Sequence, residues 1–300
     1  MGDQASNANP TGRVTVVRSL NMDLVARAPR LPKPGETLAG HAFAQVPGGK
    51  GGNQAVAAAR LGAQVAMIGC IGDDSNGGIL KAALEHEGID CAALIVVDDA
   101  SQNAIVIVAG SNAEVSPASI DAQDALIACA DVIVCQLETP PQTVRAALAA
   151  GRRLQRTTIL NPAPAATKLP VDWFPLIDYL IPNEIEAATL SGVPIATVDD
   201  ARRAAEMLKA KGARNVIVTL GAQGVFALLD GAGGKHMPAP KSNAIDTAAA
   251  GDTFIGGFAA ELARGAAVTD AIAFGQRAAA IAVTREGAQP FIPHRGEVAV

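Results

Sequence analysis

Short apolar runs rich in β-branched residues alternate with helical patterns along most of the chain, and this alternation limits the possible folds more than any other feature. Such runs are typical of buried strands, and they lie at residues 14–17, 65–71, 132–137, 158–160, 179–181 and 216–220. Helical patterns lie between them, at residues 53–61, 79–87 and 201–211. A strand, a crossover helix and a parallel strand form the repeating unit of a doubly wound sheet. We therefore predict an α/β fold with a mostly parallel sheet and helices on both faces.

Two segments interrupt the alternation and predict a small β lid. Residues 23–46 contain prolines at positions 29, 32 and 34, and residues 96–108 form an apolar run with no helical pattern beside it. In open α/β folds ligands bind outside the carboxyl ends of the strands, where such insertions can close over them. We expect a single domain over residues 13–300, with lid segments near 22–47 and 93–112. The small and polar residues 1–12 are expected to form a disordered tail.

The composition excludes several classes of function. The net charge is -5 with 18% charged residues, and no block of Lys and Arg is long enough to follow a nucleic-acid backbone. No apolar run approaches the ~20 residues that are needed to span a bilayer. The four cysteines show no C-x-x-C spacing, which favours free thiols in a reducing compartment. We expect a cytoplasmic protein that binds neither nucleic acid nor a membrane.

A run of small residues before a helical pattern is the first candidate for chemistry. The chain has no Walker A sequence, but residues 246–254 read Asp-Thr-Ala-Ala-Ala-Gly-Asp-Thr-Phe and lead into a helical stretch that ends near Arg264. The unpaired N–H groups and the macrodipole at a helix N-terminus favour an anion such as a phosphoryl group. Asp252 is expected in the first turn, where a carboxylate can accept a hydroxyl proton. Taken alone, such an aspartate is more often a simple helix cap.

A glycine-rich turn is the second candidate. Residues 47–55 read Pro-Gly-Gly-Lys-Gly-Gly-Asn-Gln-Ala, so that four glycines within five residues precede a helical pattern. Lys50 and Asn53 are placed there to meet a polar ligand. By itself the turn is a weak signal, because glycines also serve simple backbone needs. We therefore interpret this turn together with the motif at residues 246–254.

Together the two motifs closely resemble the two signatures of the ribokinase-like (PfkB) sugar kinases. Further stretches are similar to the same family, at residues 34–37, 53–58, 72–75, 161–164, 182–184, 219–221 and 280–290. The resemblance extends over nearly all of residues 14–293. It implies phosphorylation of D-ribose at the 5-hydroxyl by ATP, with Mg²⁺ bound to the nucleotide and K⁺ as an activating cation.

The resemblance also implies roles for individual residues. Asp252 would be the catalytic base, with Ala249, Ala250 and Gly251 around the γ-phosphate. Sugar binding would fall to Asn21, Asp23, Gly48, Gly49, Lys50, Asn53, Glu138 and Asp252. ATP binding would fall to Asn183, Glu186, Thr219, Gly221, Gly224, Gly251 and Gln276, and Asn183 and Glu186 would also arrange Mg²⁺ through water. K⁺ would lie among Asp246, Ala248, Ala282, Arg285 and Gly287. Without the family, Asn183 and Glu186 would pass as a helix cap, and Asn21 and Asp23 as turn residues.

Several departures from the family pattern bear on activity. Arg18 stands where the family normally has Gly, so that a long cation either crowds the sugar pocket or points outward. Gln276 replaces a residue that is often His near the adenine, which should alter packing more than chemistry. Phe291 stands where the family often offers a Ser hydroxyl, and we expect a weaker dependence on K⁺. The segment after residues 105–108 is shortened, which predicts that one lid strand is absent and that the family's lid-mediated homodimer is weakened.

Two alternatives stay open. A kinase for another sugar, a deoxyribose or a nucleoside would share these motifs, although Lys50 within Gly-Gly-Lys-Gly-Gly-Asn favours ribose. A sugar-binding or regulatory protein that has lost catalysis would be compatible with Arg18 and the shortened lid. The retention of Asp252 argues against that second alternative.

Overall fold

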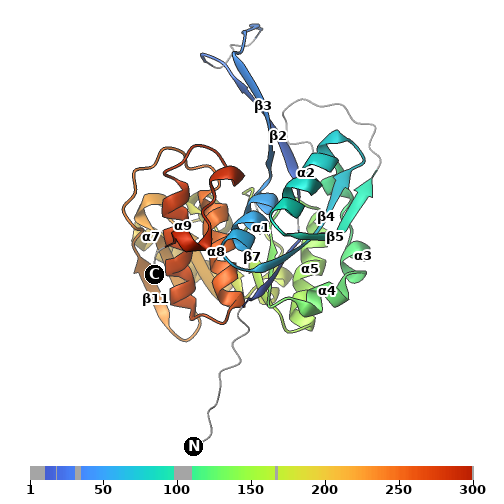
Figure 1. Cartoon of the computed structure of the whole chain (residues 1–300). Helices are drawn as coiled ribbons and strands as arrows, with labels where there is room; N and C mark the ends of the chain where they lie inside the picture. Colours follow the sequence, from blue (N-terminus) through green and yellow to red (C-terminus); the bar gives the residue numbers. More distant parts are fainter. Residues whose placement is uncertain (1–10, 18, 31–34, 98–109, 166–167, 299–300) are drawn as a thin grey trace, which may run out of the picture.

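A single large sheet forms the centre of the molecule. Figure 1 shows the computed structural model of the chain, which describes residues 11–17, 19–30, 35–97, 110–165 and 168–298. Within these residues the sheet has nine strands in the order β11-β10-β9-β8-β7-β6-β1-β4-β5. All neighbours from β9 to β5 pair in parallel, and β10 pairs antiparallel with both β9 and β11. The predicted α/β architecture is therefore confirmed. The strands are β1 (Arg13–Val17), β4 (Gln64–Gly72), β5 (Asp90–Val97), β6 (Val132–Cys135), β7 (Thr157–Leu160), β8 (Tyr179–Leu180), β9 (Asn215–Thr219), β10 (Val225–Leu229) and β11 (Gly233–Met237).

Helices cover both faces of this sheet, because successive residues of a strand point to opposite sides. Val14 and Val16 of β1 belong to one buried cluster and Val17 to the other. The first cluster is covered by α1 (Lys50–Arg60), α2 (Ser75–His86), α8 (Ala250–Ala263) and α9 (Val268–Ala282). The second is covered by α3 (Pro117–Asp121), α4 (Asp124–Cys129), α5 (Pro141–Arg153), α6 (Glu184–Ser191) and α7 (Val198–Ala210). Short 3-10 helices lie at η1 (Gly110–Glu114), η2 (Val171–Leu176), η3 (Gly221–Gln223), η4 (Gln289–Phe291) and η5 (Arg295–Glu297).

Helices α1 and α8 approach each other closely through a glycine. A Cβ added at Gly256 of α8 would lie 2.4 Å from the Cβ of Ala57 and 2.8 Å from the backbone N of Ala58. Both distances are far below the ~3.5 Å of ordinary carbon contacts, so only glycine fits here. The two helices begin at the two glycine-containing motifs of the sequence. Their close packing brings the two motifs side by side.

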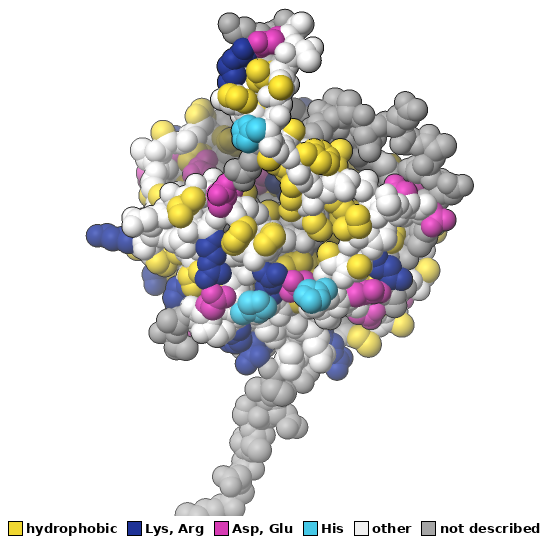
Figure 2. Space-filling view, turned by 45° about the horizontal axis from the view of Figure 1, so that its top comes forward, with side chains coloured by type: hydrophobic (Ala, Val, Ile, Leu, Met, Phe, Trp, Pro, Cys, Tyr) yellow, Lys and Arg dark blue, Asp and Glu magenta, His cyan; other side chains and the backbone are white. Residues whose placement is uncertain are grey.

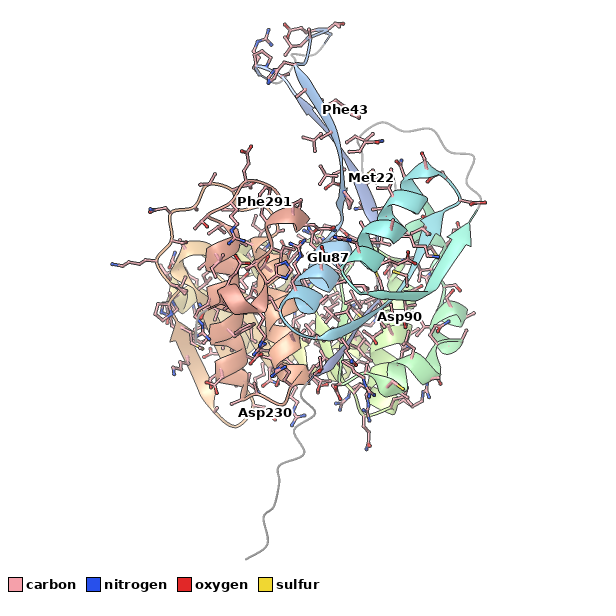
Figure 3. All side chains as sticks on the ribbon, in the orientation of Figure 1. Met22, Phe43, Glu87, Asp90, Asp230 and Phe291 are labelled. Carbon is pink, nitrogen blue, oxygen red and sulfur yellow. The ribbon has the colours of Figure 1, made fainter. Side chains whose placement is uncertain are left out.

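A two-stranded antiparallel ribbon rises away from the body (Figure 1). It consists of β2 (Asn21–Arg27) and β3 (Ala42–Gly48), with Asn21 opposite Gly48. Figure 3 shows Met22 near the body and Phe43 further along the ribbon. The ribbon matches the first predicted lid segment.

The second predicted lid segment is placed differently. Residues 93–97 belong to β5, which pairs with β4 at the edge of the main sheet, and residues 110–114 form η1. An apolar run after a helix is equally suited to a parallel edge strand, and the pairing partner decides between the two. Residues 98–109, where the missing lid strand was predicted, lie outside the described residues. In the described part of the chain the lid sheet therefore has two strands, β2 and β3.

The start of the domain lies slightly earlier than predicted. Residues 1–10 lie outside the described residues, but Gly12 accepts a hydrogen bond of 2.8 Å from the backbone N of Gln64. A Cβ at Gly12 would lie 2.2 Å from the backbone C of Ala263, so this residue is packed against α8. Across the ranges that the structure describes, no helix has the length and hydrophobicity to cross a membrane.

Candidate active site

The carboxylate of Asp252 is held at the first turn of α8 by two side-chain amides. Asn53 Nδ2 donates to its Oδ2 at 3.0 Å, and Gln54 Nε2 donates to its Oδ1 at 2.8 Å. Asp252 is 8% exposed. The residue before the helix, Ala249, has φ 57°, a left-handed conformation that costs a non-glycine residue free energy. This turn aims the first N–H groups of α8 past the end of the sheet.

The turn opens onto a pocket of about 200 Å³ at the carboxyl ends of the central strands. A Cβ added at Gly251 would meet no atom within 4 Å, so the space beside the first turn is free. The lining brings together predicted residues from distant parts of the chain. They are Lys50, Asn183, Glu186, Thr219, Ala249, Ala250, Gly251 and Asp252, joined by Asn161, Ala163, Ile181, Thr247 and Ile255.

The glycine-rich turn meets strict steric demands. A Cβ at Gly48 would lie 2.2 Å from Oδ2 of Asp23, and Gly49 has φ 81° as the residue that precedes α1. A side chain at Gly48 would displace the Asp23 carboxylate, and the conformation of Gly49 is one that glycine adopts at no steric cost. Gly48 and Gly49 are thus required by the backbone conformation and by the close approach of β2.

The predicted sugar residues of the ribbon and of the loop after β6 form a second polar cluster. Ser19 Oγ donates to Oε2 of Glu138 at 2.6 Å. Burial raises the pKa of Asp23 above its ordinary value of 3.8, and the charge of Glu138 adds to this effect. The two carboxylates therefore influence each other across the start of the lid, although they come from segments far apart in the sequence.

Asn112 of η1 organises the same cluster, and the sequence analysis missed it. Its Nδ2 donates to Oδ1 of Asn21 and to the carbonyl of Leu20, both at 3.0 Å, while its Oδ1 accepts from the Leu20 N–H at 2.9 Å. Asn112 is 4% exposed. Because the contact spans about ninety residues of chain, no local pattern indicates it. The only available signal was an Asn at the end of the predicted lid segment 93–112.

Asn183 and Glu186 form a capping box at the start of α6. Asn183 Oδ1 accepts from the Glu186 N–H at 2.8 Å, and Glu186 Oε2 accepts from the Asn183 N–H at 2.9 Å. Burial is the main cause that raises the pKa of Glu186, and the charge of Asp252 adds to it, while the bond from Asn183 and the charge of Lys50 oppose it. The cap and the ligand-binding role are compatible, since both side chains also line the pocket.

The remaining predicted ATP residues lie at the turn after β9 and at a neighbouring pocket. Gly221 and Gly224 have φ 50° and 97°, and a Cβ at Gly224 would lie 2.2 Å from the carbonyl oxygen of Met237. Gln276 Nε2 donates to that same oxygen at 2.9 Å. The neighbouring pocket has a volume of about 380 Å³ and is lined by Lys235, His236, Met237, Pro238, Pro240, Ala273, Gln276 and Arg277.

The five predicted K⁺ ligands lie on two adjoining segments. Asp246 accepts the N–H of Ala248 at 2.8 Å and the N–H of Gly287 at 2.9 Å, and these bonds lower its pKa. The carbonyl of Ala282 accepts the Arg285 N–H at 3.1 Å. Among the described residues there is no cluster of three or more His, Cys, Asp and Glu that could hold a metal ion. One carboxylate with backbone carbonyls is instead a donor set for a hard cation.

Phe291 lies against this cation segment, whereas Arg18 lies outside the described residues. A Cβ at Gly287 would lie 2.8 Å from the ring of Phe291, which is 38% exposed. The ring of Phe291 therefore covers one side of the segment with carbon atoms, and its side chain offers no oxygen.

A comparison with known proteins adds the family to this geometry. The model of the pfkB family of carbohydrate kinases matches residues 11–295. The chain belongs to this family. The family is described as one of carbohydrate kinases, and the resemblance drawn from the two motifs is confirmed.

Several relatives and solved structures of the pfkB family are similar to this chain. A ribokinase of Haemophilus influenzae is 44% identical over 95% of this chain and 96% of its own length. A deoxyribokinase of Salmonella typhi is 38% identical over 93% and 95%. The structure of Arabidopsis thaliana ribokinase complexed with ribose and ATP superimposes with a TM-score of 0.88 at 28% identity, covering 96% of this chain and 97% of that one.

Proposed function

We propose that this chain transfers the γ-phosphoryl group of ATP to the 5-hydroxyl of D-ribose, which gives ribose 5-phosphate and ADP. The observation that carries the proposal is the Asp252 carboxylate, fixed by Asn53 and Gln54 at the mouth of a pocket that a helix N-terminus opens into. The relative from Haemophilus influenzae, named ribokinase, and the Arabidopsis complex with ribose and ATP support this choice of substrates.

In the proposed reaction Asp252 accepts the proton of the 5-hydroxyl as that oxygen attacks the γ-phosphorus, and ADP leaves with the electrons of the broken P–O bond. The N–H groups of the first turn, from Ala249 to Gly251, stabilise the charge of the transferring group. A carboxylate and an anion site then come from one turn. The proposed base and the proposed phosphate site would then be neighbours in the chain.

The sugar is proposed to lie between the glycine-rich turn and the ribbon. Asn53 Oδ1 is buried and has no hydrogen-bond partner within the described part of the chain, so it is an acceptor for a sugar hydroxyl. Asp23 and Glu138 supply carboxylate acceptors, and Lys50 supplies a donor. Asn21 and the backbone at Gly48 and Gly49 complete the proposed contacts.

ATP is proposed to extend from the first turn of α8 toward Gln276. Thr219, Gly221 and Gly224 would lie along the nucleotide, and Asn183 and Glu186 would arrange Mg²⁺ and its waters. The donor set fits, because Glu186 offers a carboxylate that lines the phosphate end of the pocket. When bound, Mg²⁺ would neutralise charge on the β- and γ-phosphates.

An activating K⁺ at Asp246, with the carbonyls of Ala248, Ala282, Arg285 and Gly287, is part of the proposal. The fit rests on a single carboxylate whose lowered pKa keeps it charged beside those carbonyls. With Phe291 in place of an oxygen donor, activation by K⁺ is expected to be weak. Sugar-dependent ADP formation in KCl, compared with tetramethylammonium chloride at equal ionic strength, tests this.

A weakened homodimer through the ribbon and a cytoplasmic location complete the proposal. Val25 and Phe43 of the ribbon are 41% and 66% exposed, and Figure 2 shows hydrophobic side chains on the ribbon and on the adjoining face of the body. Sizing chromatography should show that the dimer dissociates on dilution, and a dimer that persists at low concentration would contradict the proposed weakening. The location rests on the four cysteines, none of which forms a disulfide in the described part of the chain.

Asp252→Asn provides the test of function. ADP formation that depends on ribose should fall by about 10²–10⁴, while ribose binding measured by calorimetry persists. Equal turnover in the variant would refute the role of the carboxylate. A complete lack of sugar-dependent ADP formation in the wild type would instead support a binding protein that has lost catalysis.

A second substrate deserves a parallel measurement, since one relative at 38% identity is named deoxyribokinase. The ratio of kcat/KM for ribose and 2-deoxyribose decides between them. A site whose polar groups bind the 2-hydroxyl discriminates strongly against the sugar that lacks it.

A further inference from the structure

A chain of buried side-chain amides runs behind the Asp252 carboxylate. Gln54, Gln136 and Asn161 are 1%, 0% and 7% exposed, so all three lie in the protein interior. Gln54 Nε2 donates to Asp252 Oδ1 at 2.8 Å and to Asn161 Oδ1 at 3.2 Å, and Gln54 Oε1 accepts from Gln136 Nε2. Buried polar groups are costly unless they are satisfied, so such an array is expected to do more than fill space.

The bonding pattern fixes which way each amide points. An ionised carboxylate can only accept, so Gln54 must turn its NH₂ group toward Asp252. Both of its N–H bonds are then used, one on Asp252 and one on Asn161, and its carbonyl oxygen must accept from Gln136. Asn161 in turn uses its own Nδ2 to donate to the carbonyl of Ile181 at 2.9 Å. Donation therefore runs from Gln136 to Gln54 and divides there: one branch ends on the Asp252 carboxylate, and the other passes through Asn161 to the carbonyl of Ile181.

The array connects Asp252 to the rigid part of the fold. Gln136 directly follows β6, Asn161 directly follows β7, and Ile181 directly follows β8. These are adjacent parallel strands of the sheet. Gln54 itself lies in the first turns of α1, next to Asn53, which holds the other carboxylate oxygen. The orientation of the Asp252 carboxylate is thus fixed, through these hydrogen bonds, by the carboxyl ends of three adjacent strands.

We infer that Gln54, supported by Gln136 and Asn161, is a positioning residue for the phosphoryl-transfer reaction: it sets the rotation of the Asp252 carboxylate so that one oxygen lone pair faces the sugar hydroxyl. The inference rests on the proposed role of Asp252 as the base. A carboxylate with one oxygen released rotates about its Cβ–Cγ bond, because that torsion has broad minima. Misplacement of about 1 Å in a reacting group can lower the rate by about 10²-fold.

Gln54→Met tests the inference, because methionine has a similar length and no N–H groups. The expected result is a fall in kcat of about 10- to 100-fold, while the KM for ribose changes less than about threefold. Gln136→Met, which frees the amide of Gln54 to turn over, should show a smaller fall of the same kind. A purely structural role would not separate kcat from KM in this way.

Asn215→Leu is the matched control. Asn215 is also a buried amide, 6% exposed, whose Nδ2 donates to the carbonyl of Asp178 at 2.9 Å and whose Oδ1 accepts from the Asp230 N–H at 2.8 Å. It lies at the start of β9, at the edge of the sheet opposite the pocket. Its loss should lower the melting temperature and leave kcat within twofold. Equal losses of kcat in Asn215→Leu and Gln54→Met at equal destabilisation would overturn the inference.

A double-mutant cycle separates this inference from the proposed function. In the Asp252→Asn background, Gln54→Met should change the residual turnover by less than about threefold, because the group it positions is gone. Wild-type turnover in Asp252→Asn alone would refute the role of Asp252. Loss of turnover in Asp252→Asn together with unchanged kcat in Gln54→Met would refute only the positioning role.

Discussion

Gly48→Ala is the substitution whose effect the structure specifies most closely. The new Cβ would lie 2.2 Å from Oδ2 and 2.8 Å from Cγ of Asp23, so the carboxylate must retreat by about 1 Å to reach an ordinary contact of ~3.5 Å. Hydrogen bonds to a charged group contribute about 1.5–3 kcal/mol. If Asp23 binds the sugar, losing one such bond lowers kcat/KM for ribose by about 10- to 150-fold.

The assay is a ribose titration of ADP formation, with calorimetry of ribose binding beside it. The loss should appear mainly in the ribose KM and binding constant, while the KM for ATP stays within about twofold. Gly78→Ala is the matched control, because a Cβ there meets nothing within 4 Å, and alanine stabilises a helix interior by about 1 kcal/mol. Unchanged ribose affinity in Gly48→Ala would refute the placement of Asp23 in the sugar site.

Three further substitutions test other parts of the site. Asn112→Leu leaves the buried backbone N–H and carbonyl of Leu20 unpaired. Denaturant unfolding should show a free energy of unfolding lower by about 1–3 kcal/mol, and the ribose KM should rise. Glu186 has a raised pKa in the folded state. The stability that it contributes is therefore fully present below its ordinary pKa of 4.5 and is lost as pH rises through the raised value. Glu186→Gln should gain stability relative to the wild type as pH rises across that window. Asp246 has a lowered pKa, so Asp246→Asn should lose stability above pH 3.8, with the difference disappearing as pH falls through the lowered value. An opposite pH trend in either carboxylate variant would contradict the assigned cause.

The sheet could be predicted where the sequence carries a strong apolar period. β1, β4, β6 and β9 are buried on both faces, which produces continuous apolar runs. β10 and β11 were both missed. β10 is a short apolar run, Val-Phe-Ala-Leu-Leu, that closely follows β9, and β11 reads Gly-Gly-Lys-His-Met and lies at an exposed edge. Residues 93–97 of the predicted lid segment 93–112 instead join the main sheet as part of β5. Nothing in a run of apolar residues says which strand it will pair with.

The candidate site divides in the same way. Asp252 and Lys50 were identified because each stands in a short-range motif at a helix start, whereas Asn183 was identified only through the resemblance to the family. Asn112 and Gln136 were missed, since each acts through a hydrogen bond to a residue at least 80 positions away. Only the folded chain brings Asn112 to Asn21 and Gln136 to Gln54.

The close approach of α1 and α8 at Gly256 has a consequence for the evolution of activity. Helix α1 begins at the loop proposed to bind the sugar, and α8 begins at the turn proposed to bind the phosphate. Even one added methyl group at position 256 would wedge the two helix starts apart, and acceptor and donor would separate together. A residue that touches neither substrate therefore sets the gap that the phosphoryl group has to cross.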